Sequence, residues 1–164
     1  MDKAEFEQIV RENSEPLYWQ IRRMVTSHED ANDVLQNTFL KAWKRIDDFH
    51  GDSTVFTWLS RIAINESVDF MRHNKHYADP TEDVMTLADS LLADPYFDGS
   101  ETEALFQEAV ASLPEVQRTV FTLRYYDEMK YSDISKLLNT SVGSLKASYH
   151  IAVKKIYEFF KARN

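Results

Sequence analysis

Apolar residues recur at the spacing of an α-helix along most of this 164-residue chain. In DVLQNTFLKAWKRI, residues 33–46, the spacings i, i+4, i+7, i+8 and i+11 place five apolar side chains on one stripe. These side chains are Leu35, Phe39, Ala42, Trp43 and Ile46. Glycine occupies only 3 of the 164 positions, which leaves little room for hairpin turns. The pattern predicts an all-α fold.

A second helix is predicted in residues 53–73, which read STVFTWLSRIAINESVDFMRH. Ser53 or Thr54 can cap it by accepting a hydrogen bond from a backbone N–H group. An earlier helix, or a pair of helices, covers about residues 3–25, with Pro16 as the expected break. Because the connection before the second helix is short, we expect an antiparallel helical bundle.

The charges divide the chain into two unequal parts. Residues 1–112 carry 10 basic and 22 acidic side chains, a net charge of −12, whereas residues 113–164 carry 9 and 5, a net charge of +4. Between Lys75 and Arg118 there is no Lys or Arg, and ten acids occur there. Since opposite net charges favour different partners, we expect the two parts to bind different molecules.

The acid-rich segment also loses the helical pattern. Pro80, Pro95 and Gly99 interrupt it, and its apolar residues are scattered. We therefore expect a linker, which as a disordered chain would average roughly 25–30 Å from end to end and reach ~80 Å. The expected organisation is a helical domain in residues 1–75, an acidic linker in residues 76–104 and a second helical domain in residues 105–164.

Composition excludes several classes of protein. The chain has no cysteine, so disulfides and thiolate metal sites are ruled out and a reducing compartment is the simplest setting. No apolar run approaches the ~18 residues of a membrane span, and the first ten residues lack the pattern of a signal peptide. We expect a cytoplasmic protein without membrane insertion.

Catalytic and metal-binding motifs are not found either. No histidine has a glutamate three residues before it, so the chain lacks the Glu-x-x-His pairs of a helical di-iron site. His73 and His76 could form half of a metal site, but no partner pair accompanies them. Glycine-rich phosphate loops and nucleophile elbows are missing. The sequence predicts a protein that is not an enzyme and that needs no metal or other cofactor.

Residues 113–164 contain three helical segments with clear start and stop signals. Pro114 suits the first turn of a helix, and Ser132 can cap a short helix that ends near Asn139. Ser141 can cap a longer helix after a turn of about three residues. Two helices joined in this way, the second much longer than the first, form the helix-turn-helix pattern of many DNA-binding proteins.

The last helix is predicted to have two different faces. At 100° per residue, the inner stripe consists of Val142, Leu145, Tyr149, Ala152, Val153 and Ile156, and the outer face of Gly143, Ser144, Ala147, Ile151 and Lys154. A surface that enters a DNA groove needs short side chains without negative charge, and no acid occurs from Asn139 to Lys155. Packing of this face against an apolar partner is the alternative.

Three segments of the chain, in order, read DANDVLQNTFLKAWKRIDDF, FTWLSRIAINESVDFMRH and LPEVQRTVFTLRYYDEMKYSDISKLLNTSVGSLKASYHIAVKKI. Together they resemble the extracytoplasmic-function (ECF) sigma factors of bacterial RNA polymerase over nearly the whole chain. The last segment alone resembles many helix-turn-helix regulators, but the pair of signatures across an acidic linker is specific. The resemblance implies that the first domain opens the minus-ten element and the second binds minus-thirty-five duplex.

The resemblance implies a polymerase-binding surface on the first domain. The matching positions are Asp33, Gln36, Phe39, Leu40 and Lys41. The polar members would face the clamp of core RNA polymerase. Plain core packing is the alternative for Phe39 and for Trp43.

The resemblance also implies a minus-ten site, where single-stranded bases are flipped into a pocket. The matching positions are Asp48, His50, Ser53, Arg61, Asn65 and Arg72. Asn65 offers a donor and an acceptor to a base edge, although a solvated helix residue is the alternative. Many members of the family have Arg at the position of Ile64, so one phosphate contact of the family is not expected here.

The matching minus-thirty-five surface lies on the helix-turn-helix. Its residues are Arg124, Ser141, Ser144, Lys146, Ala147, Ser148, His150, Ile151, Lys154 and Lys155. Family members often have Arg where this chain has Ser148, Ile151 and Val153. Because Arg is the usual bidentate reader of guanine, we expect recognition here through serine hydroxyls and apolar contacts with thymine methyl groups. A contact of Ile151 with polymerase or with the other domain is the alternative.

The partners that the resemblance implies are core RNA polymerase, promoter DNA and an anti-sigma factor, which is analogy with the family. The acidic linker would suit the basic channel of nascent RNA, or it serves solubility alone. The main competing class is a two-domain repressor that binds a palindromic operator as a dimer and needs no polymerase.

Overall fold

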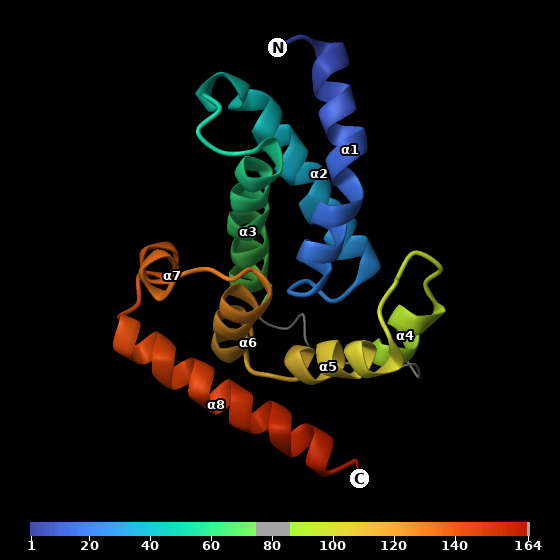
Figure 1. Ribbon diagram of the computed structural model, residues 1–164, viewed down its shortest axis with the longest axis vertical. Helices are drawn as coiled ribbons and strands as arrows, with labels where there is room; N and C mark the ends of the chain where they lie inside the picture. Colours follow the sequence, from blue (N-terminus) through green and yellow to red (C-terminus); the bar gives the residue numbers. More distant parts are fainter. Residues whose placement is uncertain (75–85, 164) are drawn as a thin grey trace. The chain divides into compact units, whose positions relative to one another are not determined.

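The computed structural model describes residues 1–74 and 86–163, and Figure 1 shows their helices. Every regular element of these residues is helical, which confirms the predicted all-α class. The chain divides into two compact units, Met1–Asn74 and Lys75–Asn164. Each unit has its own buried core and is described by itself.

The first unit is a three-helix bundle. Helices α1 (Lys3–Arg22), α2 (His28–Lys44) and α3 (Val55–His73) pack against one another in all three pairs, and the 3₁₀ turn η1 (Ile46–Asp48) follows α2. Burying an aliphatic side chain contributes about 1.5–3 kcal/mol, so a few such residues hold the bundle together. The largest fully buried ones are Leu17, Ile21, Met24, Val25 and Leu59.

Polar side chains fix the starts of these helices. Asp2 caps α1 in a capping box with Glu5, whose N–H donates to Asp2 Oδ1 over 2.8 Å. Ser27 caps α2, and Thr54 caps α3 by accepting a hydrogen bond of 3.1 Å from the backbone of Thr57. Of the two predicted caps for the helix before His73, Thr54 is therefore the one used.

Pro16 lies inside α1 and does not break it, so the predicted break is wrong. Proline within a helix removes one backbone hydrogen bond and costs about 3 kcal/mol in isolation. The turn that follows Pro16 buries Leu17, Tyr18 and Ile21 in the bundle. This burial offsets the local cost, because tertiary packing overrides local helix preference.

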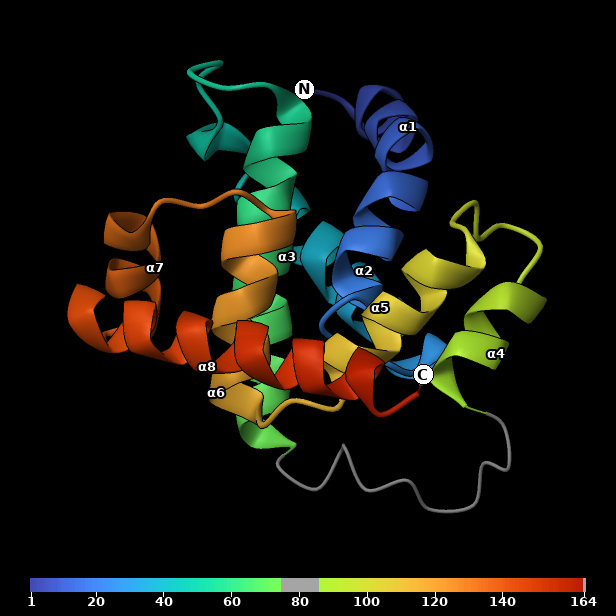
Figure 2. The ribbon, with the colours of Figure 1, turned by 60° about the horizontal axis from the view of Figure 1, so that its bottom comes forward.

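The second unit contains five α-helices and a π-helical turn among the residues that the structure describes. They are α4 (Leu87–Ala93), α5 (Glu101–Ala111), α6 (Glu115–Phe121), η2 (Thr122–Tyr126), α7 (Tyr131–Leu138) and α8 (Val142–Lys161). In Figure 2, α8 crosses α5 and α6, with which it forms the core. The core residues are Ala109, Val110, Leu113, Phe121, Ala152 and Ile156.

The structure differs from the predicted linker of residues 76–104. Residues 75–85 lie outside the described residues, but α4 and the first turn of α5 occupy much of the remainder. Ala88 and Leu91 are buried, and the N–H of Ala88 donates to Oε1 of Glu108 on α5 over 3.0 Å. Ala88 and Leu91 therefore belong to the core of the second unit.

Candidate nucleic-acid interface

Helices α7 and α8 form a helix-turn-helix, as predicted. After Leu138 the chain turns at Asn139, whose φ of 52° is left-handed and whose N–H donates to the carbonyl of Ser135. Ser141 then caps α8 by accepting a hydrogen bond of 3.2 Å from the N–H of Ser144. The turn at Asn139 and the cap at Ser141, both predicted from the sequence, are therefore confirmed.

The buried face of α8 is narrower than predicted. Leu145, Ala152 and Ile156 are buried, and Tyr149 is partly buried, but Val142 and Val153 are 36% and 45% exposed. The prediction of Val142 and Val153 as inner residues is therefore wrong. On the helical wheel these two positions lie at the edge of the apolar stripe, which α5, α6 and α7 cover only along its centre.

The outer face of α8 is smooth and carries no acid in its first three turns. All five predicted outer residues are exposed, as are Lys146, His150 and Lys155, whereas Ser148 is partly buried. A Cβ atom at Gly143 would meet nothing within 4 Å. Nothing in the second unit requires glycine there, although glycine in a helix costs up to about 1 kcal/mol relative to alanine. An open glycine of this kind favours close approach of another molecule.

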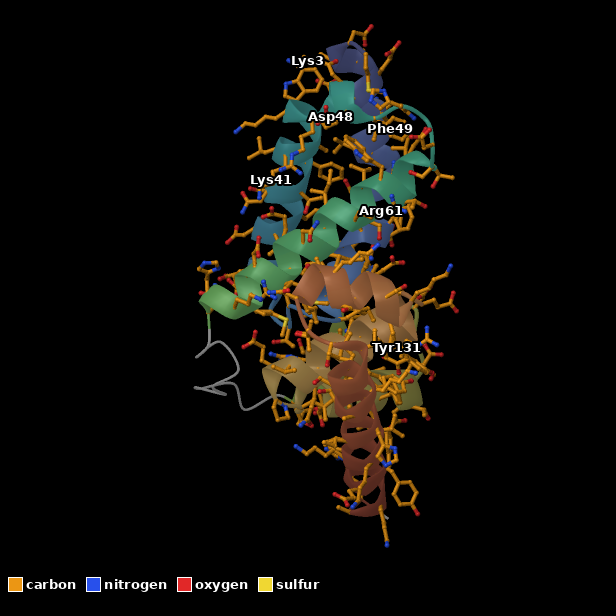
Figure 3. All side chains as sticks on the ribbon, turned by 90° about the vertical axis from the view of Figure 1, so that its left-hand side faces the viewer. Lys3, Lys41, Asp48, Phe49, Arg61 and Tyr131 are labelled. Carbon is orange, nitrogen blue, oxygen red and sulfur yellow. The ribbon has the colours of Figure 1, made fainter. Side chains whose placement is uncertain are left out.

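Tyr131 brings two of the predicted DNA contacts together. The guanidinium of Arg124 lies 4.8 Å from its ring centroid, and the ammonium of Lys146 lies 5.8 Å from it. Tyr131 is labelled in Figure 3. Tyr131 is not among the residues predicted from the sequence; an aromatic residue at the start of a predicted helix, close to basic side chains, is the signal that could have found it. Helix α7 begins at Tyr131 without a side-chain cap, so the predicted cap Ser132 is wrong.

Tyr149 completes this aromatic corner, with its ring centroid 6.5 Å from that of Tyr131 in an edge-to-face arrangement. Burial raises the pKa of Tyr149 above its ordinary value of 10.0, and Tyr131 raises it further, while Arg124 acts in the opposite direction. The net upward direction keeps the phenol neutral at physiological pH. The edge-to-face contact is therefore unaffected by ionisation there.

Helix α2 carries the predicted polymerase contacts on an exposed side. Asp33, Gln36 and Leu40 recur at helical spacing and are all exposed, with Leu40 at 59%. Single exposed apolar residues are common on proteins, so the polar pair characterises this surface better. Lys41 is also exposed but forms an ion pair with Glu66 of α3, and Figure 3 shows it projecting from α2.

The two aromatic residues of the polymerase-binding segment differ from each other. Phe39 is partly buried in the bundle, which agrees with core packing. Trp43 is 43% exposed and its ring packs against that of Phe6 on α1, with centroids 4.9 Å apart. Trp43 therefore has one face against α1 and another open to a partner.

Helix α3 presents the predicted minus-ten residues along one exposed side. Arg61, Asn65 and Arg72 are all exposed at the spacing i, i+4 and i+11, and Arg61 is labelled in Figure 3. Ile64 is only 8% exposed. Its side chain has neither a charge nor a hydrogen-bond donor, so this position offers no phosphate contact in this chain.

The loop before α3 holds the remaining minus-ten residues. Asp48 and His50 are exposed, and Ser53 is partly exposed. Phe49, labelled with Asp48 in Figure 3, packs against Trp58 of α3 with ring centroids 5.2 Å apart. This ring pair anchors the loop on α3, so the exposed loop residues are held on a fixed base.

The described part of the chain meets neither the requirements of a metal site nor those of a membrane-spanning helix. No three His, Cys, Asp or Glu side chains of residues 1–74 and 86–163 are placed to share a metal ion, and His76 lies outside these residues. None of the described helices combines the length and the apolar character needed to span a bilayer.

Two small helical units, the second with a helix-turn-helix whose long helix is smooth and basic, define a DNA-binding transcription protein. Residues 9–77 match the family model Sigma-70 region 2, and residues 103–156 match Sigma-70, region 4. The chain is 31% identical over 159 residues to the ECF RNA polymerase sigma factor SigW of Bacillus subtilis, which covers 91% of this chain and 85% of that protein. The chain belongs to the ECF RNA polymerase sigma factors, which direct the polymerase to promoters.

One further relative and two solved structures are also similar to this chain. The RNA polymerase sigma-H factor of Pseudomonas aeruginosa is 29% identical over 162 residues, with 89% of this chain and 81% of that protein covered. Among solved structures, the sigma factor RpoE of Bartonella quintana, in complex with the anti-sigma factor NepR, has a TM-score of 0.67 and 24% identity over 98% of this chain and 99% of that chain. CnrH, in complex with the cytosolic domain of CnrY, has a TM-score of 0.62 and 23% identity over 99% and 92%. These two likenesses show the fold.

Proposed function

We propose that the two units divide promoter recognition between them. The first unit binds core RNA polymerase through α2 and holds the separated minus-ten strand on α3 and its preceding loop. The second unit places α8 in the major groove of the minus-thirty-five element. The protein acts in the cytoplasm, performs no chemistry of its own and needs no cofactor.

The observation that carries this proposal is the outer face of α8. It combines exposed hydroxyl groups, an alanine, an isoleucine and several lysines with a glycine whose Cβ position is empty. Short side chains let a helix approach base edges, and lysines offer phosphate contacts without sequence preference. Because no arginine lies on this face, Ser144 and Ala147 are the candidates to read bases, with Ile151 against a thymine methyl group.

The minus-ten assignment is supported by the exposed row on α3. A base edge can be read by the amide of Asn65, and phosphates can be bound by Arg61 and Arg72 on the same side. The loop residues Asp48 and His50 lie before this helix on a base anchored by the Phe49 ring. Single-stranded nucleic acid needs this combination of fixed polar groups and positive charge.

An anti-sigma factor is proposed as a further partner. The sigma factor RpoE, which shares this fold, was solved with the anti-sigma factor NepR, and CnrH, which also shares it, with the cytosolic domain of CnrY. By analogy, such a partner would cover surfaces that otherwise bind polymerase. Asp33 and Gln36 on α2 are exposed and available for such competition.

Transcription with purified core polymerase tests the assignment of the second unit. Run-off transcription from fragments of the source genome is compared for the parent, Ala147→Glu and Ala162→Glu. Both alanines are exposed, one on the outer face of α8 and one just after its last residue. We expect Ala147→Glu to abolish promoter-specific transcripts, because a carboxylate in the groove repels phosphates, and Ala162→Glu to retain them.

The same transcription assay, together with a binding titration of the free protein, distinguishes the proposed sigma factor from a dimeric repressor. Tight binding of the free protein to a palindromic duplex as a dimer, with no transcript when core polymerase is added, would contradict the proposal.

For the first unit, Asp33→Arg should change the free energy of unfolding by less than about 0.5 kcal/mol and sharply reduce co-purification with core polymerase. Undiminished co-purification would remove Asp33 from the interface.

A further inference from the structure

The corner where η2, α7 and α8 meet concentrates positive charge on one aromatic ring. Arg124 reaches the Tyr131 ring from η2, Lys146 reaches it from α8, and Tyr131 itself opens α7. The Nη1 group of Arg124 also donates to the carbonyl of Met129 over 3.0 Å. Three elements that are separate in the sequence are thus joined through one side chain.

Among the residues that the structure describes, neither cation at this ring forms an ion pair with a carboxylate. Within residues 1–74 and 86–163, ion pairs join Lys41 to Glu66 and Arg163 to Glu108, and neither pair includes Arg124 or Lys146. Like charges that converge on one point repel each other, so this arrangement is unfavourable by itself. The negative face of the aromatic ring offsets the repulsion, because each cation is attracted to the ring quadrupole.

A ring of this kind limits the freedom of two long side chains. Lys and Arg each lose considerable rotamer entropy when a ligand fixes them, and a side chain already held in place loses less. The hydrogen bond from Arg124 to the backbone fixes one of the two in a second way. The Tyr131 ring, partly buried and in contact with Tyr149, is itself held in place.

We infer that Tyr131 is a positioning residue whose ring holds Arg124 and Lys146 together, ready to bind the phosphate backbone beside the groove that α8 enters. The inference rests on the proposed binding of duplex by the second unit. The ring acts through its face, so the hydroxyl group is dispensable for this role. The residue increases affinity for any duplex sequence and contributes nothing to the choice of bases.

The experiment measures binding of the parental and variant proteins, each assembled with core polymerase, to a duplex fragment that the parent transcribes. Affinity is measured over a series of salt concentrations. Tyr131→Leu removes the ring face, Tyr131→Phe retains it, and Tyr157→Leu is the matched control. Tyr157 lies on α8, is 66% exposed and makes no ring contact with any described residue.

We expect Tyr131→Leu to weaken binding about tenfold and to make the slope of log affinity against log salt shallower by about 1, the value of one phosphate contact. Tyr131→Phe and Tyr157→Leu should match the parent. Parental affinity and slope in Tyr131→Leu would overturn the inference, as would a loss in Tyr131→Phe equal to that in Tyr131→Leu.

A double-mutant cycle separates positioning from general support of the fold. In an Arg124→Gln, Lys146→Gln background, adding Tyr131→Leu should cause no further loss of affinity, because the cations it positions are gone. A further loss of the same size as in the parent would overturn the inference. Failure of the parent to transcribe any fragment would instead contradict the proposed function.

A spectroscopic measurement on the full chain does not depend on any variant folding well. The side-chain methylene protons of Arg124 and Lys146 should show upfield ring-current shifts in the NMR spectrum of the free protein. Methylene resonances at ordinary positions in the parent would overturn the inference.

Discussion

The two units of this protein differ in how aromatic rings are arranged around their aliphatic cores. The first unit buries mainly aliphatic residues between three helices of 17 to 20 residues. The second unit has shorter helices around one long one, and a group of aromatic rings surrounds Phe121, the buried ring of its mainly aliphatic core. Phe121 packs against Phe106, Tyr125 and Tyr149 with ring centroids 5.8, 5.1 and 5.4 Å apart.

This difference has a physical reason. Short helices offer few buried positions each, so a small unit needs large side chains to bury enough apolar area. The same rings extend to the surface at the helix-turn-helix, where Tyr149 contacts Tyr131 and Tyr131 contacts two cations. In the second unit, core and proposed binding surface are therefore connected, whereas α2 and α3 of the first unit carry their proposed polar binding residues on exposed faces.

The largest expected effect comes from Phe121→Ala. Phe121 is 3% exposed at the centre of the ring group, and removing a buried Phe costs about 3–5 kcal/mol. We expect the second unit to unfold at much lower denaturant while the first unit keeps its hydrogen-exchange protection. Equal loss of protection in both units would contradict the view that each unit has its own core, because it would mean that the two cores unfold together.

A somewhat smaller effect is expected for Leu91→Ala in α4. Leu91 is fully buried, and its truncation should destabilise the second unit by about 2–4 kcal/mol. Leu92→Ala is the matched control, because Leu92 is 44% exposed and its loss should change stability by under ~0.5 kcal/mol. If both variants unfold like the parent in denaturant titrations, α4 is a linker segment and not part of the second core.

Asn65→Ala tests the first unit at a surface position. Its amide is exposed on α3, so stability should not change, whereas loss of one base-edge contact costs about 1–3 kcal/mol once the strands have separated. We expect weaker permanganate reactivity of minus-ten thymines with unchanged polymerase binding. Gln8→Ala, at an exposed position of α1, is the control, and equal reactivity in both variants would place Asn65 outside the site.

The smallest effects are expected when the same substitution, glycine to alanine, is made once in each unit. Gly143 and Gly51 both have empty space at their Cβ positions, but Gly51 has a φ of 79°. Gly143→Ala should stabilise the protein by about 0.5–1 kcal/mol and weaken promoter binding, whereas Gly51→Ala should destabilise it by about 1 kcal/mol. Thermal melts and binding titrations check both, and unchanged promoter binding in Gly143→Ala would show that DNA does not approach this glycine closely.

Several features of the chain could be read from short stretches of sequence. The helical class, the cap at Thr54, the turn at Asn139 and the cap at Ser141 each depend on neighbouring residues, and all four are confirmed. The caps of α4 and α5, Thr86 and Ser100, are equally local signals, but they lie in an acid-rich segment whose composition predicts a linker. The candidate site residues on α2, α3 and α8 remain predictions, although nearly all of them lie on exposed surfaces.

The sequence by itself determined where α3 and α8 begin and where α7 ends, because capping and turn geometry involve residues three or four positions apart. Only the tertiary structure decided that Pro16 continues α1, that α4 packs on α5 and that Val153 is exposed. It also decided that Arg124 and Lys146 meet at Tyr131. Periodicity reports which face of a helix is apolar, but which neighbour covers that face depends on packing between residues far apart in the chain.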